Sequence, residues 1–298
     1  MALGLGGACG SLVGAYITEY SHPRWAFLIY SFLGLIVMAL GAMLDPSVEM
    51  EAASDEGKAK PQLLENLKRS ASQVRAALRL EEIYRVILFF LLCGVTGPTF
   101  GEFWYYFQMN IVEFSKFQYA MMNVLGYASV FFGTLLYNMW LKEMEIRDLL
   151  RYAVILSVFS SACSGVFAMR WNLLLGISDT AYIATSDVLM STLALATTQM
   201  PTMVLFAKVT PEHIEATCFA FLTGTSNFCN GVLAPLMGSF INDFFVGVSK
   251  EDFSKFHYLC AIGLVSQFAP FFFLHLIPTK QEIKDLQESR ENAEAKEK

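Results

Sequence analysis

Charged residues are scarce in this sequence. Only 16% of its 298 residues are Asp, Glu, Lys or Arg, whereas 55% are hydrophobic. Soluble domains carry about 25% charged residues, so this composition argues against an ordinary soluble protein and favours a membrane protein. The net charge is −6 and no stripe of basic residues runs along the chain, which argues against nucleic-acid binding.

Catalytic and metal-binding patterns are also missing. No GxSxG, HExxH, CxxC or Walker sequence occurs, although such patterns mark many hydrolases, metalloproteases, redox proteins and NTPases. The glycine-rich start GLGGACG follows no predicted strand, so it indicates helix packing rather than a phosphate-binding loop. The six cysteines are scattered through apolar runs without metal-ligand spacing. We therefore expect that the protein is not an enzyme and that it binds no metal and no cofactor.

Long apolar stretches dominate the rest of the chain. A helix that crosses a bilayer needs about 20 mostly apolar residues. Eight stretches reach or approach that length: 2–20, 24–44, 84–109, 118–141, 149–169, 180–207, 213–244 and 256–277. Backbone groups in lipid must be hydrogen-bonded within the protein, so each stretch is predicted to be helical. The predicted fold class is an all-α bundle of about eight membrane helices.

The remaining charge is unevenly distributed. A linker at 45–83 and a tail at 279–298 carry much of it. Counting alternate loops gives two sets. One set holds only Arg24, Lys116, Arg170, Lys250 and Lys255 of the 21 Lys and Arg residues. Because positive residues gather on the cytoplasmic side, we expect the linker and both termini to be cytoplasmic. The sequence leaves open which membrane this is.

Two acidic residues lie inside the apolar stretches. Asp187 lies well within 180–207, and Glu102 lies within 84–109. Ionisable groups at membrane depth are costly and mark functional sites by default. Asp187 is predicted to face an internal cavity, where it binds substrate or a coupling proton. Glu102 is the second candidate, but solvation near the membrane surface explains it equally well.

Helical spacing places further polar side chains near these acids and on one additional helix. The candidate cavity-lining residues are Tyr105, Ser191, Thr198, Thr217 and Asn227. Small polar stripes also serve ordinary helix packing, and a tyrosine near the end of a span is equally an interfacial anchor. Three helices with polar or small faces nevertheless predict a bundle around a polar interior, which suits a transport pathway.

The segment NLLLGISDTAYIATSDVLMSTLALATTQMPTMVLFAKVTPEHIEATCFAFLTGTSNF resembles the folate–biopterin transporter family, a branch of the major facilitator superfamily. In that family an acid also precedes an aromatic cluster further upstream, where Glu102 stands in place of the more usual Asp. Besides Asp187, the positions that match the family pattern are Tyr137, Asn138, Arg147, Gly176, Asp179, Met200, Pro201, Pro211 and Glu215.

The resemblance implies transport of folate or pterin by alternating access, coupled to protons or another ion. Family members usually have twelve spans, and this chain resembles them from the fifth span onward. It implies four parts: the last two helices of an N-terminal half at 1–44, a cytoplasmic linker at 45–83, a six-helix C-terminal half at 84–278, and a cytoplasmic tail at 279–298. We expect a fragment of a longer gene rather than a shortened paralogue.

Other functions remain open at this stage. The chain is alternatively a non-transporting membrane scaffold or subunit, or a carrier of another small metabolite, because a fold does not fix a substrate. A two-sided cavity would need a missing N-terminal half, a homodimer or another membrane subunit. Membrane lipid is also expected as a partner, because it surrounds the spans. Folate also carries an anionic tail, and no Lys or Arg lies deep in the eight stretches.

Overall fold

The computed structural model describes residues 2–43 except residue 23, residues 80–210 and residues 215–285, with the isolated positions 75, 78 and 288. Every regular element in these ranges is helical. The elements are α1 Ala2–Tyr20, α2 Arg24–Ala42, α5 Glu81–Thr96, α6 Gly101–Asn110, α7 Lys116–Leu136, η1 Tyr137–Leu141, α8 Ile146–Ala168, α9 Trp171–Leu174, α10 Asp179–Ala194, η2 Leu195–Gln199, α11 Met200–Val209, α12 Glu215–Phe228, η3 Cys229–Leu233, α13 Ala234–Ile241, η4 Asn242–Val246, α14 Phe256–Ser266, α15 Ala269–Phe273 and η5 Leu274–Leu276.

Most of these helices suit a membrane. Five runs are long and apolar enough to cross one: Arg24–Ala42, Lys116–Leu141, Ile146–Ala168, Asp179–Val209 and Phe256–Asp285. A sixth forms if α5 and α6, which are bent by 41° at the break between them, count as one span. The other two predicted stretches are helical as well, in α1 and in the run from α12 to η4. The prediction of an all-α membrane bundle is confirmed.

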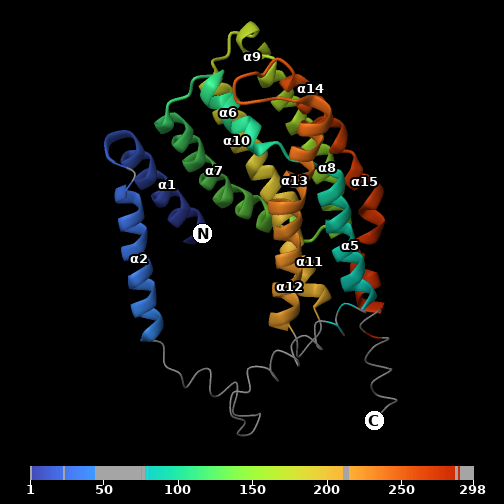
Figure 1. Cartoon of the computed structure of the whole chain (residues 1–298). Helices are drawn as coiled ribbons and strands as arrows, with labels where there is room; N and C mark the ends of the chain where they lie inside the picture. Colours follow the sequence, from blue (N-terminus) through green and yellow to red (C-terminus); the bar gives the residue numbers. More distant parts are fainter. Residues whose placement is uncertain are drawn as a thin grey trace.

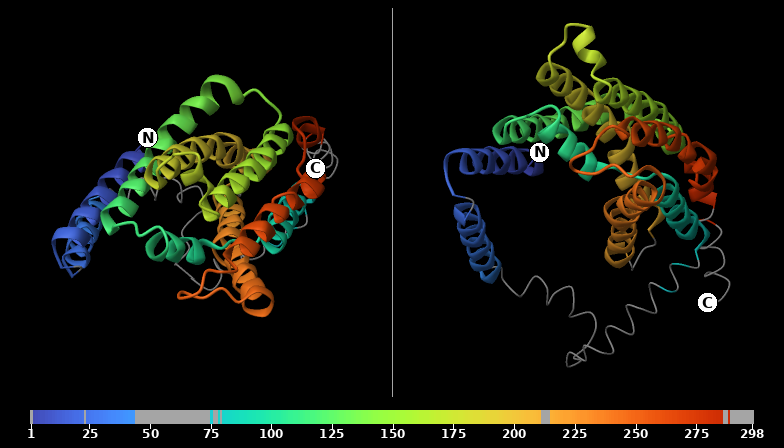
Figure 2. Two further views of the ribbon diagram at one scale, coloured as in Figure 1. Left: turned by 90° about the horizontal axis from the view of Figure 1, so that it is seen from above. Right: turned by 45° about the horizontal axis from the view of Figure 1, so that its top comes forward.

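The helices from α5 to η5 form one bundle, and α1 and α2 stand to one side of it (Figures 1 and 2). α1 packs along α7. A Cβ atom added at Gly7 would lie only 2.2 Å from the ring of Tyr127, so a glycine is required where this ring meets α1. α2 has no buried residue. The first two helices therefore touch the bundle mainly through α7.

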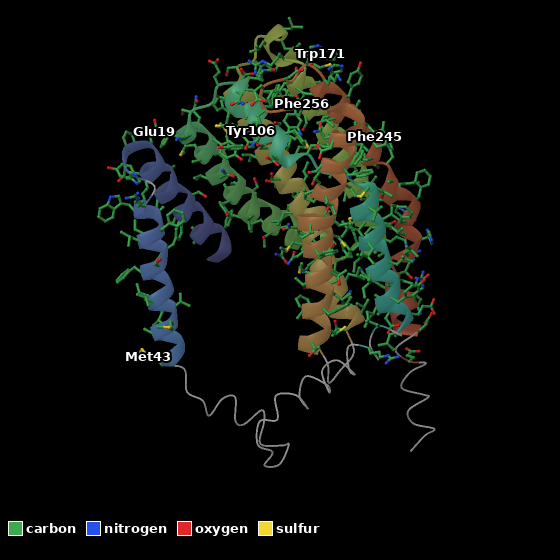
Figure 3. All side chains as sticks on the ribbon, in the orientation of Figure 1. Glu19, Met43, Tyr106, Trp171, Phe245 and Phe256 are labelled. Carbon is green, nitrogen blue, oxygen red and sulfur yellow. The ribbon has the colours of Figure 1, made fainter. Side chains whose placement is uncertain are left out.

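Large apolar side chains cover the outer surface. Phe245 is 76% exposed and Met43 is 81% exposed, and Figure 3 shows both projecting away from the helices. Extended exposed apolar surface is unfavourable in water and marks a membrane or protein contact. Together with the apolar spans, this surface indicates that the chain is an integral, multi-pass membrane protein.

Two apolar cores close the two ends of the bundle. At the end where the linker joins α5, Ile83 and Phe206 belong to one buried cluster. At the opposite end, Phe107 and Phe256 belong to another, with ring centroids 4.8 Å apart. Helices in lipid associate through van der Waals packing and interhelical hydrogen bonds rather than the hydrophobic effect. Close packing at both ends therefore fixes the bundle, and the polar cavities lie between the two cores.

Hydrogen bonds reinforce the linker end. Arg147 donates to the carboxylate of Glu282 at 3.0 Å and to the carbonyl of Ile277 at 2.8 Å. The same carboxylate accepts the backbone N–H of Thr279 at 2.9 Å. Arg85 donates to a carbonyl of η5 at 2.9 Å. These bonds tie the starts of α5 and α8 to the chain that follows η5, so Arg147 of the family pattern serves as a structural joint.

A second network shapes the hairpin between α8 and α10 at the opposite end. Asp179 accepts from Arg170 at 2.8 Å and from the side-chain amide of Asn172 at 2.8 Å. Asn172 is completely buried. Gly176 has φ +71°, a left-handed conformation that favours glycine. Asp179 and Gly176 of the family pattern therefore hold a turn.

The two sets of basic loop residues lie at opposite ends of the bundle. Arg85 and Arg147 hydrogen-bond to the chain that follows α15. Arg170 lies in the α8–α10 hairpin, and the Lys250 carbonyl accepts from Asn110 at the end of α6. The alternation of loops inferred from the sequence thus corresponds to the two ends. Which end faces the cytoplasm stays a prediction.

We predict that Gly238→Ala lowers the free energy of unfolding by about 1–3 kcal/mol, as overpacking does. A Cβ atom there would lie 2.0 Å from the carbonyl oxygen of Thr99, and the N–H of Thr99 donates to Ala234 at 3.0 Å. The matched control is Gly224→Ala, where a Cβ meets no atom within 4 Å. Thermal unfolding of the purified variants in detergent measures the difference, and equal stability would contradict the close approach at Gly238.

We also predict that Asp179→Ala lowers stability by about 1–3 kcal/mol, because a buried hydrogen-bonding group that loses its partner pays its desolvation cost. The change leaves Arg170 and Asn172 without this acceptor. The control is Asp148→Ala, which breaks an ion pair whose side chains are 51% and 46% exposed and should cost about 0–1 kcal/mol. A loss no larger than the control's in the same unfolding assay would sink the proposed role of the network.

Candidate functional site

Asp187 lies on α10, which begins at Asp179, so it is about 12 Å along the helix at about 1.5 Å per residue. This position lies inside the apolar span Asp179–Val209, which has 31 residues. The carboxylate lines a cavity of about 210 Å³ with Gln108 of α6 and with Ser160 and Ser164 of α8. Among the residues that the structure describes, it forms no hydrogen bond or ion pair.

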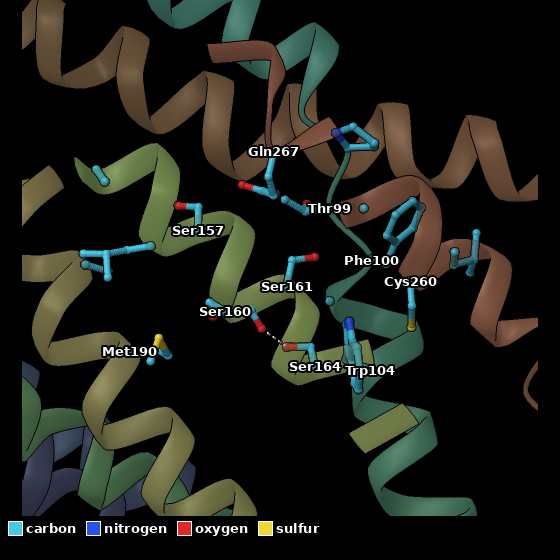
Figure 4. A pocket seen from close by; sticks show the side chains of 17 residues that line it. Thr99, Phe100, Trp104, Ser157, Ser160, Ser161, Ser164, Met190, Cys260 and Gln267 are labelled. Carbon is cyan, nitrogen blue, oxygen red and sulfur yellow. Dashed lines mark hydrogen bonds between the residues drawn. The ribbon is translucent and has the colours of Figure 1, made fainter. Parts of the chain in front are cut away.

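A row of serines lines the next cavity, which has a volume of about 400 Å³ (Figure 4). The row consists of Ser157, Ser160, Ser161 and Ser164 on α8. Steps of three and four residues put them on one helix face, and Ser164 donates to the carbonyl of Ser160 at 3.0 Å. The walls of this cavity and of the Asp187 cavity share Trp104, Ser160, Ser164 and Met190, so the two adjoin.

A third cavity, of about 260 Å³, continues the series. Thr198, Thr202 and Asn230 line it. Its wall shares Thr99, Ala153, Ser157 and Gln267 with the serine-lined cavity. We call the three together the cavity chain. Asp187 is the one Asp, Glu, Lys or Arg among the residues that line it, so a single carboxylate stands in an otherwise neutral polar interior.

The backbone departs from α-helical geometry beside the third cavity. The π-helical turn η2 precedes Pro201, and the π-helical turn η3 precedes Pro235. Proline cannot donate to the carbonyl one turn earlier, and π turns occur often at functional sites. Thr198 lies in η2 and Asn230 lies in η3. The Met-Pro pair of the family pattern therefore adjoins an irregular segment that lines a cavity.

Glu102 lies apart from the cavity chain. Its side chain is 65% exposed and lies 3.9 Å from the ammonium group of Lys250. That ammonium group lies 4.4 Å from the ring centroid of Tyr106. A hydrogen bond with Tyr106, with further help from the charge of Glu102, raises the pKa of Lys250 above its ordinary value. The geometry corresponds to the alternative in which Glu102 is solvated.

Of the remaining cavity candidates, Thr198 lines the cavity chain and the other four do not. Tyr105 lies in the wall of another cavity, between α1, α2, α6 and α7. The candidates that line none of these four cavities are Ser191, Thr217 and Asn227. Thr198 is thus the predicted lining residue that shares the cavity chain with Asp187. Sequence reasoning missed the serine row and Gln267, although the three- and four-residue spacing of the serines was visible.

Two further residues of the family pattern, Tyr137 and Asn138, make contacts within the helix bundle. Tyr137 is buried at the start of η1, and the side-chain amide of Asn138 donates to the carbonyl of Thr134 at 2.9 Å. Pro211 lies outside the described residues, and so does the side chain of Glu215. Neither Tyr137 nor Asn138 lines the cavity chain.

Metal binding finds no support in the described part of the chain. No three side chains of His, Cys, Asp or Glu come together there as a metal site requires. The six cysteines are all free. The chemistry available at Asp187 is therefore hydrogen bonding and proton exchange by one carboxylate, surrounded by hydroxyl and amide groups.

Comparison with known proteins gives a consistent set of relatives. Folate transporter 1 of Plasmodium falciparum (isolate 3D7) is 23% identical over 284 residues, covering 95% of this chain and 53% of that protein. The folate-biopterin transporter of Synechocystis sp. (strain ATCC 27184 / PCC 6803 / Kazusa) is 26% identical over 290 residues, covering 96% and 56%. Probable folate-biopterin transporter 6 of Arabidopsis thaliana is 30% identical over 187 residues, covering 62% and 37%. No solved structure matches.

These relatives are named as transporters rather than enzymes. The chain spans about half the length of the curated relatives it matches, with 53% and 56% of two of them covered. The model of the BT1 family matches residues 1–297, nearly the whole sequence. The match therefore includes both the helical pair at the start and the bundle with its cavity chain. The chain belongs to the BT1 family.

Proposed function

We propose that this chain takes part in transporting folate- or pterin-type small molecules across a membrane by alternating access. The names of the relatives support the substrate class, and the apolar helices support the membrane location. The chain spans about half the length of those relatives. The substrate and the transport activity of the complete assembly are therefore proposed here and are not carried over from the relatives.

Asp187 is the observation that carries the proposal. It is a carboxylate within an apolar span, in the wall of a polar cavity, and it forms no ion pair with a described residue. A pterin ring presents an amino-pyrimidinone edge, and a carboxylate accepts two parallel hydrogen bonds from such an edge. The same carboxylate can instead take up and release a proton during the transport cycle. Either role uses the free acceptor capacity of Asp187.

Alternating access requires two halves that move relative to each other around a site near the midplane. We assign residues 84–278 to a six-helix C-terminal half and residues 1–44 to the last two helices of an N-terminal half. α1 meets the bundle mainly through α7, and α2 has no buried residue, which supports this division (Figure 1). The remaining helices of a two-sided cavity would come from a longer chain, a second copy or another subunit.

We further assign the end that carries the linker to the cytoplasm. Arg85, Arg147 and Lys280 lie at this end, together with the basic residues of the 45–83 linker in the sequence. Short loops rich in Lys and Arg stay on the cytoplasmic side during membrane insertion. The linker and the 279–298 tail would then face the cytoplasm.

Asp187→Asn tests the role of the carboxylate. Hydrogen bonds to charged groups contribute about 1.5–3 kcal/mol, so losing them lowers substrate uptake by about tenfold or more. Uptake of radiolabelled folate and biopterin into proteoliposomes under an imposed pH gradient measures the effect. The matched control is Asp243→Asn, which changes an exposed acid outside the cavity chain and should retain wild-type uptake.

The same assay distinguishes the two roles and the competing functions. Loss of gradient-driven accumulation with intact exchange identifies a proton carrier, whereas loss of both identifies a ligand contact. Wild-type uptake by the Asp187 variant would overturn both roles. If the unaltered chain moves another metabolite but neither folate nor biopterin, it is a carrier of different specificity. If it moves nothing in the panel, the scaffold function gains support.

Orientation has its own prediction. A protease site inserted in the 45–83 linker should be cut in inside-out membrane vesicles and protected in right-side-out vesicles, because positive loops stay cytoplasmic. A site inserted in the loop between η4 and α14 should give the opposite pattern. Cleavage of the linker site in right-side-out vesicles would reverse the proposed orientation.

A further inference from the structure

A cavity of about 640 Å³ lies between α1, α2, α6 and α7, apart from the cavity chain. Its volume falls within the range of about 300–1,000 Å³ that is typical of small-molecule sites. Glycine and alanine residues of α1 form one side, and tyrosines of α6 and α7 form the other. The cavity thus has an aromatic wall on which a planar ligand can stack.

Glycines keep the α1 side open. A Cβ atom added at Gly10 or Gly14 meets no atom within 4 Å, and both residues line the cavity. Gly7, one turn before Gly10, is instead in contact with Tyr127. The space next to α1 is therefore unfilled along about one helical turn, and the Tyr127 ring bounds it.

The facing wall is aromatic. The rings of Tyr105 and Tyr119 lie edge to face, with centroids 5.2 Å apart and an interplanar angle of 83°. Aromatic groups bind one another in edge-to-face or offset-stacked arrangements, and Tyr105 is 41% exposed, so a face remains accessible to a ligand ring.

Ser11, Asn123 and Lys116 add polar groups to the cavity wall. The amide nitrogen of Asn123 donates to the carbonyl of Tyr119 at 3.2 Å, which leaves the amide oxygen as an acceptor for a ligand. Lys116, the first residue of α7, lines the same cavity and forms no ion pair with a described residue. No Asp or Glu is among the described residues that line the cavity. An anionic group therefore has one available cation there and no competing carboxylate.

We propose that this cavity binds a planar heteroaromatic ring that carries an anionic tail. The ring lies between the glycines of α1 and the tyrosines, and the carboxylate of the tail pairs with Lys116. This inference rests on the proposed function for the substrate class and adds a binding site for that substrate apart from Asp187. Lys116 then separates folate-type ligands, which carry carboxylates, from unconjugated pterins, which carry none. Lys116 stands at the start of the span Lys116–Leu141 rather than deep within it.

Equilibrium dialysis of the purified full chain in detergent against radiolabelled folic acid and biopterin tests the cavity. Gly10→Leu places a side chain in the open space and should weaken binding of both ligands by about tenfold or more, since an occupied pocket excludes the ring. The matched control is Gly6→Leu. Gly6 is on the same helix and exposed, its added Cβ also meets no atom within 4 Å, and it does not line the cavity.

Lys116→Gln tests the charge. It should weaken binding of folic acid by about fivefold, as loss of a partly exposed ion pair does, and leave binding of biopterin unchanged. Lys116→Arg should keep the binding of folic acid. The control is Lys255→Gln, which removes the same charge from an exposed loop residue outside the cavity and should change neither ligand.

The outcomes separate the two proposals. Equal binding by the Gly10 and Gly6 variants, while the wild-type chain binds, overturns this cavity as the ligand site and leaves the proposed function standing. An equal effect of Lys116→Gln on both ligands overturns the pairing with the anionic tail. A wild-type chain that binds neither ligand overturns the proposed function, and this inference with it.

Discussion

The cost of an unpaired backbone group in lipid is the constraint on which the rest of this structure depends. Each such group costs several kcal/mol, so spanning segments must satisfy their hydrogen bonds within a helix. The described spans are accordingly helical. The exceptions are informative. The break between α5 and α6 is sealed by the bond from Thr99 to Ala234 at 3.0 Å, and the π turns η2 and η3 contribute Thr198 and Asn230 to a cavity.

The same constraint divides the bundle into three levels. At each end, charged groups meet partners: Arg147 with Glu282 at one end, and Arg170 with Asp179 at the other. Apolar clusters pack beside these networks. In between, the cavity chain presents hydroxyl and amide groups and the carboxylate of Asp187, which pairs with no described residue. Close packing holds the ends together, and the middle level offers polar groups that lipid lacks.

The position of a side chain could be predicted from the sequence where the chemistry of that residue restricts its possible environments. Asp187 was identified as a cavity residue because a carboxylate in an apolar run has few acceptable environments. Glu102 was harder, since its surroundings depend on the position of Lys250, which lies far away in the sequence. Likewise, Gly224 and Gly238 both lie in the predicted stretch 213–244. Of these two glycines, an added Cβ would clash at Gly238 and not at Gly224, because the break between α5 and α6 lies opposite Gly238. The serine row on α8 was missed, since a serine in a helix can satisfy its hydroxyl on a carbonyl of its own helix.

The sequence alone determined the class of protein, the helical spans, the grouping of basic loops and the family resemblance, because hydropathy, helical period and motif order are properties of contiguous residues. Tertiary structure alone decided which polar groups meet. It joined Ser160 and Ser164 to Asp187, turned the Asp179 motif into a hairpin joint, and placed Lys116 beside the tyrosines of α6 and α7. These meetings depend on how separate helices cross and pack, which is not encoded in the spacing within any one helix.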